Sequence, residues 1–99
     1  MLIPKRSPTP PGVILKAHYL DPRGVSIAAF ARAVGCSRKH MSGIVHGNAR
    51  IEAPLATRIA RVLDTTPQFW LNLQNAVDLF NAAQEIKHWE PETIYHAVV

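Results

Sequence analysis

The fold of this 99-residue chain is decided by the stretch SIAAFARAVGCSRKHMSGIVHG, residues 26–47. Ser26 suits an N-cap, because its hydroxyl can accept a hydrogen bond from a free N–H of a first helical turn. Helical spacing of apolar residues then continues to Val34. Gly35 suits a turn in which the backbone takes a positive φ, and Ser37 can cap a second helix from residue 38 to about 46. The stretch therefore predicts two short helices joined by a tight turn.

The two predicted helices carry the residues that a close crossing requires. Ala31 is small where the helices meet, and Met41 and Ile44 have the spacing to lock the second helix onto the first. The same features occur in an ordinary helical hairpin inside a bundle, so that alternative stays open. The outer face of the second helix would then present Arg38, Lys39, Ser42, Gly43 and His46.

Three more helices are predicted around this pair. Pro11 and Gly12 begin a helix with an apolar face at positions 13, 14, 17 and 20, which ends at residues 21–24. Pro54 begins a helix with an apolar stripe up to Leu63, and Thr66 caps the longest helix, about 67–87. Strand-like alternation is absent from the sequence. We therefore expect an all-α fold, a five-helix bundle.

The domain organisation is simple. Residues 1–10, with three prolines, are expected to form a flexible arm, residues 11–87 one domain, and residues 88–99 a tail of unassigned structure. The chain has no apolar run of about 18 residues and no secretion signal, so we expect no membrane association. A single cysteine, Cys36, cannot form an internal disulfide, and a cytoplasmic location is expected.

Charge is distributed unevenly along the chain. Residues 1–61 contain ten basic and two acidic residues, a net charge of +8, whereas residues 62–99 contain one lysine and five acidic residues, a net charge of −4. A basic part of this kind indicates a polyanionic partner such as nucleic acid. A solvated surface with uneven charge is the alternative.

The second helix of the pair has the residues for reading double-stranded DNA. An arginine at a helix start is able to grip guanine O6 and N7 with two bonds, and lysine donates to the same edge, so Arg38 and Lys39 are the predicted base readers. The loop beyond adds two phosphate candidates. The full predicted set is Ser37, Arg38, Lys39, His40, Ser42, His46, Asn48 and Arg50, with Arg32 and Arg58 as weaker candidates. A solvated charged face is again the alternative.

An enzyme is disfavoured. His40 and His46 are six residues apart, and the sequence has no His/Cys cluster at metal-ligand spacing, so we expect no catalytic residue, metal or cofactor. Cys36 and His40 have the residue types of a catalytic dyad. We expect instead that Cys36 is a small residue buried in the turn.

Three patches resemble the HigA-like antitoxins, a branch of the XRE-type helix-turn-helix regulators related to phage repressors. The first patch is PGVILK (residues 11–16), followed by YLDPRGVS (19–26). The second is the pair of helices through HGNARI (46–51). The third runs from RIA (58–60) through TPQFWLNLQ (66–74), with Asp78-Leu79 following. Three residues depart from the family pattern: Val13 replaces a frequent Glu, Cys36 a Val or Ile, and Ile27 a Gln that often touches the DNA backbone.

The resemblance implies a phage-repressor-like helix-turn-helix in a homodimer that binds an inverted repeat in its own promoter. It also implies a partner, a HigB-like, RelE-type toxin that cleaves ribosome-bound mRNA and is neutralised by the antitoxin. From the residues themselves, the last helix has more apolar surface than so short a chain easily buries, and a two-fold dimer would cover it. The predicted dimerisation residues are Phe69, Trp70, Leu73, Val77 and Phe80, unless they complete the monomer core.

Two further functions remain open. A stand-alone XRE-type transcriptional regulator would share the DNA-binding face and lack the toxin. An interaction module that has lost DNA binding would keep the fold without the contacts of Arg38 and Lys39.

Overall fold

The computed structural model describes residues 6–98, so residues 1–5 of the predicted arm and residue 99 lie outside the description. Within the described residues the chain forms helices and no strand, which confirms the predicted all-α, five-helix fold. The α-helices are α1 (Pro11–Ile14), α2 (Ile27–Val34), α3 (Arg38–Val45), α4 (Ala53–Leu63) and α5 (Pro67–Glu85). A π-helical segment, η1 (Leu15–Leu20), and a 3-10 turn, η2 (Asp21–Arg23), follow α1.

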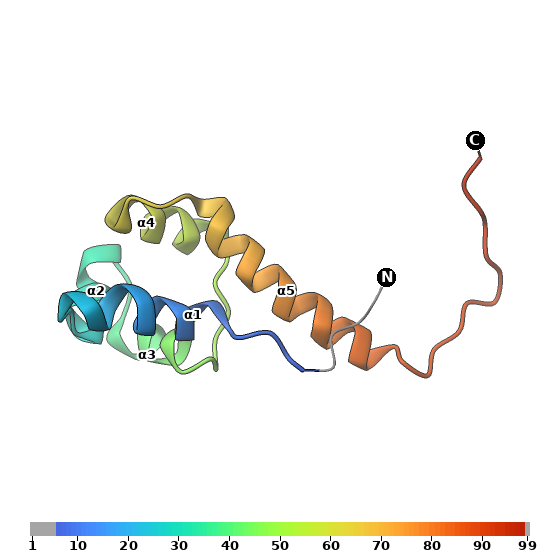
Figure 1. Ribbon diagram of the computed structural model, residues 1–99, viewed down its shortest axis with the longest axis horizontal. Coiled ribbons are helices and arrows are strands. Elements are labelled where there is room, and N and C mark those ends of the chain that lie inside the picture. Colours follow the sequence, from blue (N-terminus) through green and yellow to red (C-terminus); the bar gives the residue numbers. More distant parts are fainter. Residues whose placement is uncertain (1–5, 99) are drawn as a thin grey trace.

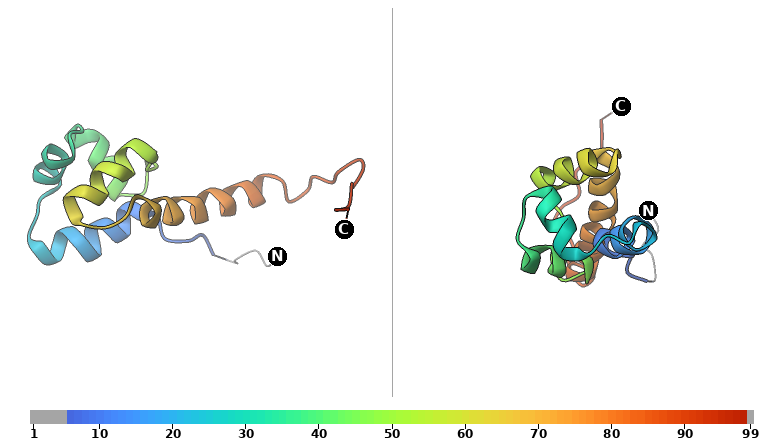
Figure 2. Two further views of the ribbon diagram at one scale, coloured as in Figure 1. Left: turned by 90° about the horizontal axis from the view of Figure 1, so that it is seen from above. Right: turned by 90° about the vertical axis from the view of Figure 1, so that its left-hand side faces the viewer.

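The helices form a compact body from which α5 projects. Figure 1 shows α1 to α4 gathered at one end, while α5 begins against them and runs outward to the C-terminal tail. The second views confirm that the outer half of α5 lies beyond the body (Figure 2). The radius of gyration is 16.7 Å, compared with about 13 Å for a compact chain of 100 residues. This excess reflects the outer half of α5 and the tail beyond it, which both extend away from the body (Figures 1 and 2).

The first helix differs from the expected amphipathic α-helix. After one α-helical turn the chain widens into η1, where the Asp21 N–H bonds to the carbonyl of Lys16, five residues earlier. This wider repeat buries Leu15 and Leu20, which are five residues apart, and leaves Val13 37% exposed. The predicted face at positions 13, 14, 17 and 20 is therefore wrong except at its end, because it assumed the α-helical repeat.

Gly12 brings α1 into close contact with α3. A Cβ atom built on Gly12 would lie 1.7 Å from the backbone oxygen of Ile44, far inside any real contact. The absence of a side chain thus lets the backbones of α1 and α3 meet, and this contact supports the inner face of α3.

The first half of α5 completes the core. Trp70 is fully buried, its indole Nε1 donates to Thr65 Oγ1 over 2.8 Å, and its ring packs edge-on against Tyr19 and Phe69. The Trp70 side chain is therefore enclosed within one protomer, where it completes the core, as in the alternative left open for the predicted dimerisation residues. Thr66 caps α5 as expected, accepting from the Phe69 N–H over 3.2 Å.

The C-terminal segment has no regular structure. The last α-helix ends at Glu85, two residues before the predicted limit, and residues 88–98 form neither helix nor strand.

None of the helices in the described part of the chain is long and apolar enough to cross a membrane.

Candidate nucleic-acid interface

The pair α2–α3 forms the predicted helix-turn-helix. Ser26 Oγ accepts from the Ala29 N–H and Ser37 Oγ accepts from the His40 N–H, each over 3.0 Å, so both predicted N-caps are confirmed. Gly35 has a φ of 72° at the turn, a backbone conformation that favours glycine. Two capped helices separated by a left-handed glycine give a turn with little freedom to vary.

The inner face of α3 is locked in place. Met41 and Ile44 are fully buried, and Ala31 of α2 is 2% exposed at the crossing. These are the residues predicted for those roles, and their burial fixes which side of α3 faces outward.

The outer face of α3 begins with a pair of cations. Arg38 and Lys39 are exposed in the first turn, and neither forms a salt bridge with another described residue. An arginine without a carboxylate partner keeps its five donors available for an external acceptor. The first turn of α3 therefore presents two cations to a ligand.

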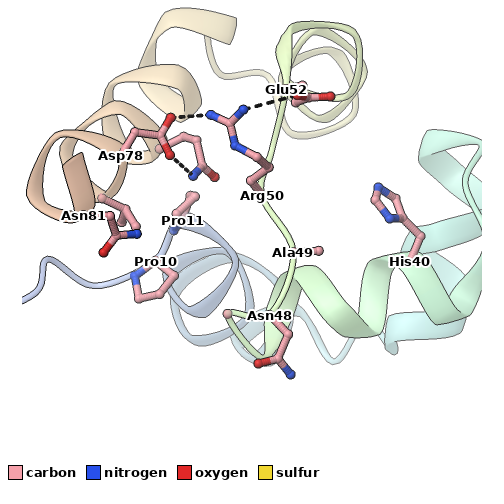
Figure 3. A pocket seen from close by; sticks show the side chains of 12 residues that line it. Pro10, Pro11, His40, Asn48, Ala49, Arg50, Glu52, Asp78 and Asn81 are labelled. Atoms are coloured by element: carbon pink, nitrogen blue, oxygen red, sulfur yellow. Dashed lines mark hydrogen bonds and ion pairs between the residues drawn. The ribbon is translucent and has the colours of Figure 1, made fainter. Parts of the chain in front are cut away.

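The remaining polar residues of α3 are placed differently. The ring of His40 lies above a groove between α3 and the loop that follows (Figure 3). His46, by contrast, folds back on its own helix, with Nδ1 2.7 Å from the Ser42 carbonyl oxygen and 3.3 Å from Ser42 Oγ. Because a carbonyl oxygen only accepts, Nδ1 is the donor in this bond.

The loop after α3 is held to that helix by backbone hydrogen bonds, while its Asn48 side chain is exposed. The N–H groups of Asn48 and Ala49 both bond to the Gly43 carbonyl, over 2.8 and 3.1 Å, while the Asn48 side chain points away from the body (Figure 3). Asn48 therefore offers its side-chain amide, and not its backbone, to a phosphate.

Arg50 has partners that sequence reasoning missed. Its guanidinium bonds to Glu52 Oε1 over 3.2 Å and to Asp78 Oδ2 of α5. Asp78 also accepts from Gln74 Nε2 over 3.0 Å. The signal available in the sequence was weak: Gln74 and Asp78 are four apart and share a helix face, but nothing local pairs them with Arg50.

These residues surround an open, polar hollow. It has a volume of about 620 Å³ and lies between the loop, the start of α1 and the middle of α5 (Figure 3). Pro10, Pro11, His40, Asn48, Arg50 and Asp78 contribute to its walls. The hollow separates the loop beyond α3 from the projecting helix, and the Arg50 bonds cross it.

The exposed apolar surface of α5 lies further out than predicted. Phe69 is 39% exposed, and Leu73, Val77 and Phe80 are partly buried. Sequence reasoning missed Leu79, which is 59% exposed, and the exposed apolar residues beyond the helix, Ile86 and Trp89.

Cys36 lies partly buried in the turn between α2 and α3. Partial burial raises the pKa of the Cys36 thiol, against the opposing effects of the Arg58 guanidinium and the Met41 N–H. A nucleophilic cysteine needs the opposite shift. The described residues contain no group of three His, Cys, Asp or Glu side chains placed to hold a metal ion.

Comparison with known proteins agrees with this geometry. Residues 17–68 match the family model of the Cro/C1-type HTH DNA-binding domain. The chain is 42% identical over 77 residues to antitoxin HigA-1 of Vibrio cholerae, covering 78% of this chain and 72% of that protein. It is 39% identical over 85 residues to the HTH-type transcriptional regulator YbaQ of Escherichia coli, covering 86% and 75%.

A solved structure extends the likeness to the whole chain. Antitoxin GraA in complex with its operator superposes with a TM-score of 0.82 at 35% identity, and the match covers 100% of both chains. The α2–α3 geometry, the family model and these relatives agree: the chain belongs to the Cro/C1-type helix-turn-helix DNA-binding proteins and, within them, to the HigA-like antitoxins.

Proposed function

We propose that this protein is an antitoxin and transcriptional repressor that binds operator DNA as a homodimer and neutralises a HigB/RelE-like, mRNA-cleaving toxin. The observation that carries the DNA-binding part is the pair Arg38 and Lys39, exposed and without salt bridges among the described residues at the first turn of a helix whose other face is locked. Such a protein acts in the cytoplasm, together with its DNA, and no catalytic role is assigned to it.

In the proposed complex α3 enters the major groove by its N-terminal end. Arg38 and Lys39 donate to guanine edges, and the caps and polar residues around them contact bases or phosphates. The half-buried Gly43 lets the groove approach closely. Arg50 is treated separately below, because two carboxylates engage it. The supporting contacts come from Ser37, His40, Ser42, His46 and Asn48.

A dimer gives α5 a role. The outer half of this helix projects from the body and exposes Leu79, with Val77 and Phe80 partly exposed beside it. A two-fold partner would cover this surface together with Phe69 and Leu73. Two copies of α3 would then read half-sites one DNA turn apart, about 34–36 Å, as an inverted repeat requires.

Substitution of the two cations tests the DNA-binding proposal. Because both make base contacts in the proposed complex, Arg38→Ala/Lys39→Ala is expected to weaken binding to duplex DNA from upstream of the gene at least a hundredfold in a shift assay at fixed salt. Arg61→Ala/Lys87→Ala, which removes equal charge from α4 and from the turn just after α5, serves as the control. Equal losses of affinity in the two double variants would mean that Arg38 and Lys39 act only through nonspecific attraction to the DNA charge. Unchanged binding by Arg38→Ala/Lys39→Ala would exclude base contacts in the major groove.

The toxin partner distinguishes the two leading functions. The relative HigA-1 is named as an antitoxin, whereas YbaQ, at nearly the same identity, is named as a transcriptional regulator, which keeps a regulator without a toxin as the second candidate. Co-expression with the adjacent gene and pull-down separates them. Recovery of a small RelE-like protein, together with relief of its growth arrest, supports the antitoxin; a neighbour that neither binds nor arrests growth supports the regulator.

A further inference from the structure

The segment between α3 and α4 is fastened to α5 by a buried side chain. Among residues 6–98, Gln74 is the one buried polar residue, with 6% of its surface exposed. Its Oε1 accepts from the Ile51 N–H over 2.8 Å and its Nε2 donates to Asp78 Oδ1 over 3.0 Å. The orientation of the amide is thus set at both ends, by the loop and by its own helix.

Arg50 completes a closed ring. Asp78 receives Gln74 on one oxygen and Arg50 on the other, and Arg50 directly precedes Ile51. Figure 3 shows the guanidinium reaching across the hollow to α5. We call these four residues, Arg50, Ile51, Gln74 and Asp78, the loop clamp. It joins a segment that begins five residues beyond the end of α3 to the middle of α5.

The ion pair between Arg50 and Asp78 in the loop clamp is not explained by a contribution to folding stability. The Ile51 side chain is fully buried and already anchors the segment. The side chains of Arg50 and Asp78 are 53% and 38% exposed, and exposed ion pairs contribute only about 0–1 kcal/mol to folding. The pair instead ties the loop that follows α3 to the projecting helix α5, and so sets the position of the loop relative to that helix.

We propose that Gln74 and Asp78 are positioning residues for DNA binding, and that Arg50 acts through Asp78 rather than on a phosphate. This inference rests on the proposed function of α3 and α5. If α5 forms the dimer, the distance between two recognition helices depends on the angle between α3 and α5 in each protomer. The loop clamp holds that angle, so that the dimer meets two half-sites at once.

The test uses a short duplex selected by the wild-type protein from a random-sequence library, with a scrambled duplex for comparison. Asp78→Asn and Arg50→Gln are each expected to weaken binding to the selected duplex about tenfold, and the double variant no more than either single variant. Binding to the scrambled duplex, corrected for charge, is expected to stay within about twofold. Glu85→Gln, the same charge change further along α5, supplies the correction for Asp78→Asn.

The salt dependence of binding separates positioning from direct contact. A residue that acts through the loop leaves the slope of log K against log salt unchanged. If Arg50 contacts a phosphate, Arg50→Gln flattens that slope by about 0.9 and Asp78→Asn tightens binding by releasing the arginine. Either result overturns the proposal, and so does wild-type affinity in both variants.

Folding and assembly are measured alongside. Each variant is checked by thermal unfolding and by sedimentation, because a loss of folded dimer lowers binding to both duplexes together, and that pattern also counts against positioning. Gln74→Glu keeps the acceptor for Ile51 while repelling Asp78, and it is expected to behave like Asp78→Asn. A wild-type protein that selects no duplex contradicts the proposed function itself, whereas selective wild-type binding with unaffected variants contradicts only the loop clamp.

Discussion

Replacing Gly12 with alanine is expected to destabilise the protein far more than an ordinary glycine-to-alanine change. The new Cβ would lie 1.7 Å from the Ile44 backbone oxygen, so α1 and α3 must separate by more than an ångström. Overpacking of this kind costs about 1–3 kcal/mol, and the upper end applies because a backbone atom cannot rotate away. The higher helix propensity of alanine offsets about 1 kcal/mol of this destabilisation. The net loss is therefore about 2 kcal/mol.

The matched control is Gly43→Ala in α3. There the nearest heavy atom to an added Cβ is the Ala49 Cβ, at 3.4 Å, an ordinary contact, so only the gain in helix propensity remains and stability should rise by up to about 1 kcal/mol. At about 4–8 °C per kcal/mol, Gly12→Ala lowers Tm by about 8–16 °C and Gly43→Ala raises it slightly.

Thermal unfolding at one protein concentration is the assay, because the proposed dimerisation would make Tm depend on concentration. DNA binding adds a second readout, since the methyl of Gly43→Ala lies on the face proposed to meet DNA. That variant should be more stable and yet bind its duplex more weakly. Equal Tm values for the two variants would refute the close-contact reasoning, and wild-type DNA affinity in Gly43→Ala would place that face away from the groove.

The other predictions concern single contacts. Trp70→Ala should lose about 3–5 kcal/mol in urea unfolding, because it empties a core site; a smaller loss would mean that the core collapses around it. Ser37→Ala should lose about 1 kcal/mol with its cap, and no loss would show that the cap is dispensable. Leu79→Asp should raise the dimer Kd at least tenfold in sedimentation, with Asn75→Asp as the control. Because the folded pKa of Cys36 is raised, the neutral thiol favours folding, and this contribution is lost as pH rises above about 8.5; Cys36→Ala should remove that part of the pH dependence.

Local signals made most of the helices predictable. The caps at Ser26, Ser37 and Thr66 bond within three residues of themselves, and the left-handed Gly35 acts at one position. Each is a short-range interaction that the sequence displays directly. The fold class and the outward face of α3 followed from them.

The remainder depends on contacts that a local pattern does not contain. Leu15 is buried because η1 is π-helical, and an apolar pattern read with the α-helical repeat assigns the wrong face. Gln74 bonds to a backbone N–H 23 residues earlier, and Asp78 to a side chain 28 residues earlier. The sequence therefore predicts Arg50 as a phosphate contact and gives no sign of the distant carboxylate of Asp78 that engages its guanidinium.

The division of α5 into two halves links these observations. Trp70 and Gln74 bind the first half to the body, while Leu79 and the residues beyond leave the second half uncovered. One continuous helix thus belongs both to the core and to the proposed dimer surface. The loop clamp lies at the boundary between the halves, where a change in the direction of α5 would be passed to the loop beyond α3. In the proposed dimer, a rigid connection there would let the folded body of each protomer set the spacing of the two recognition helices.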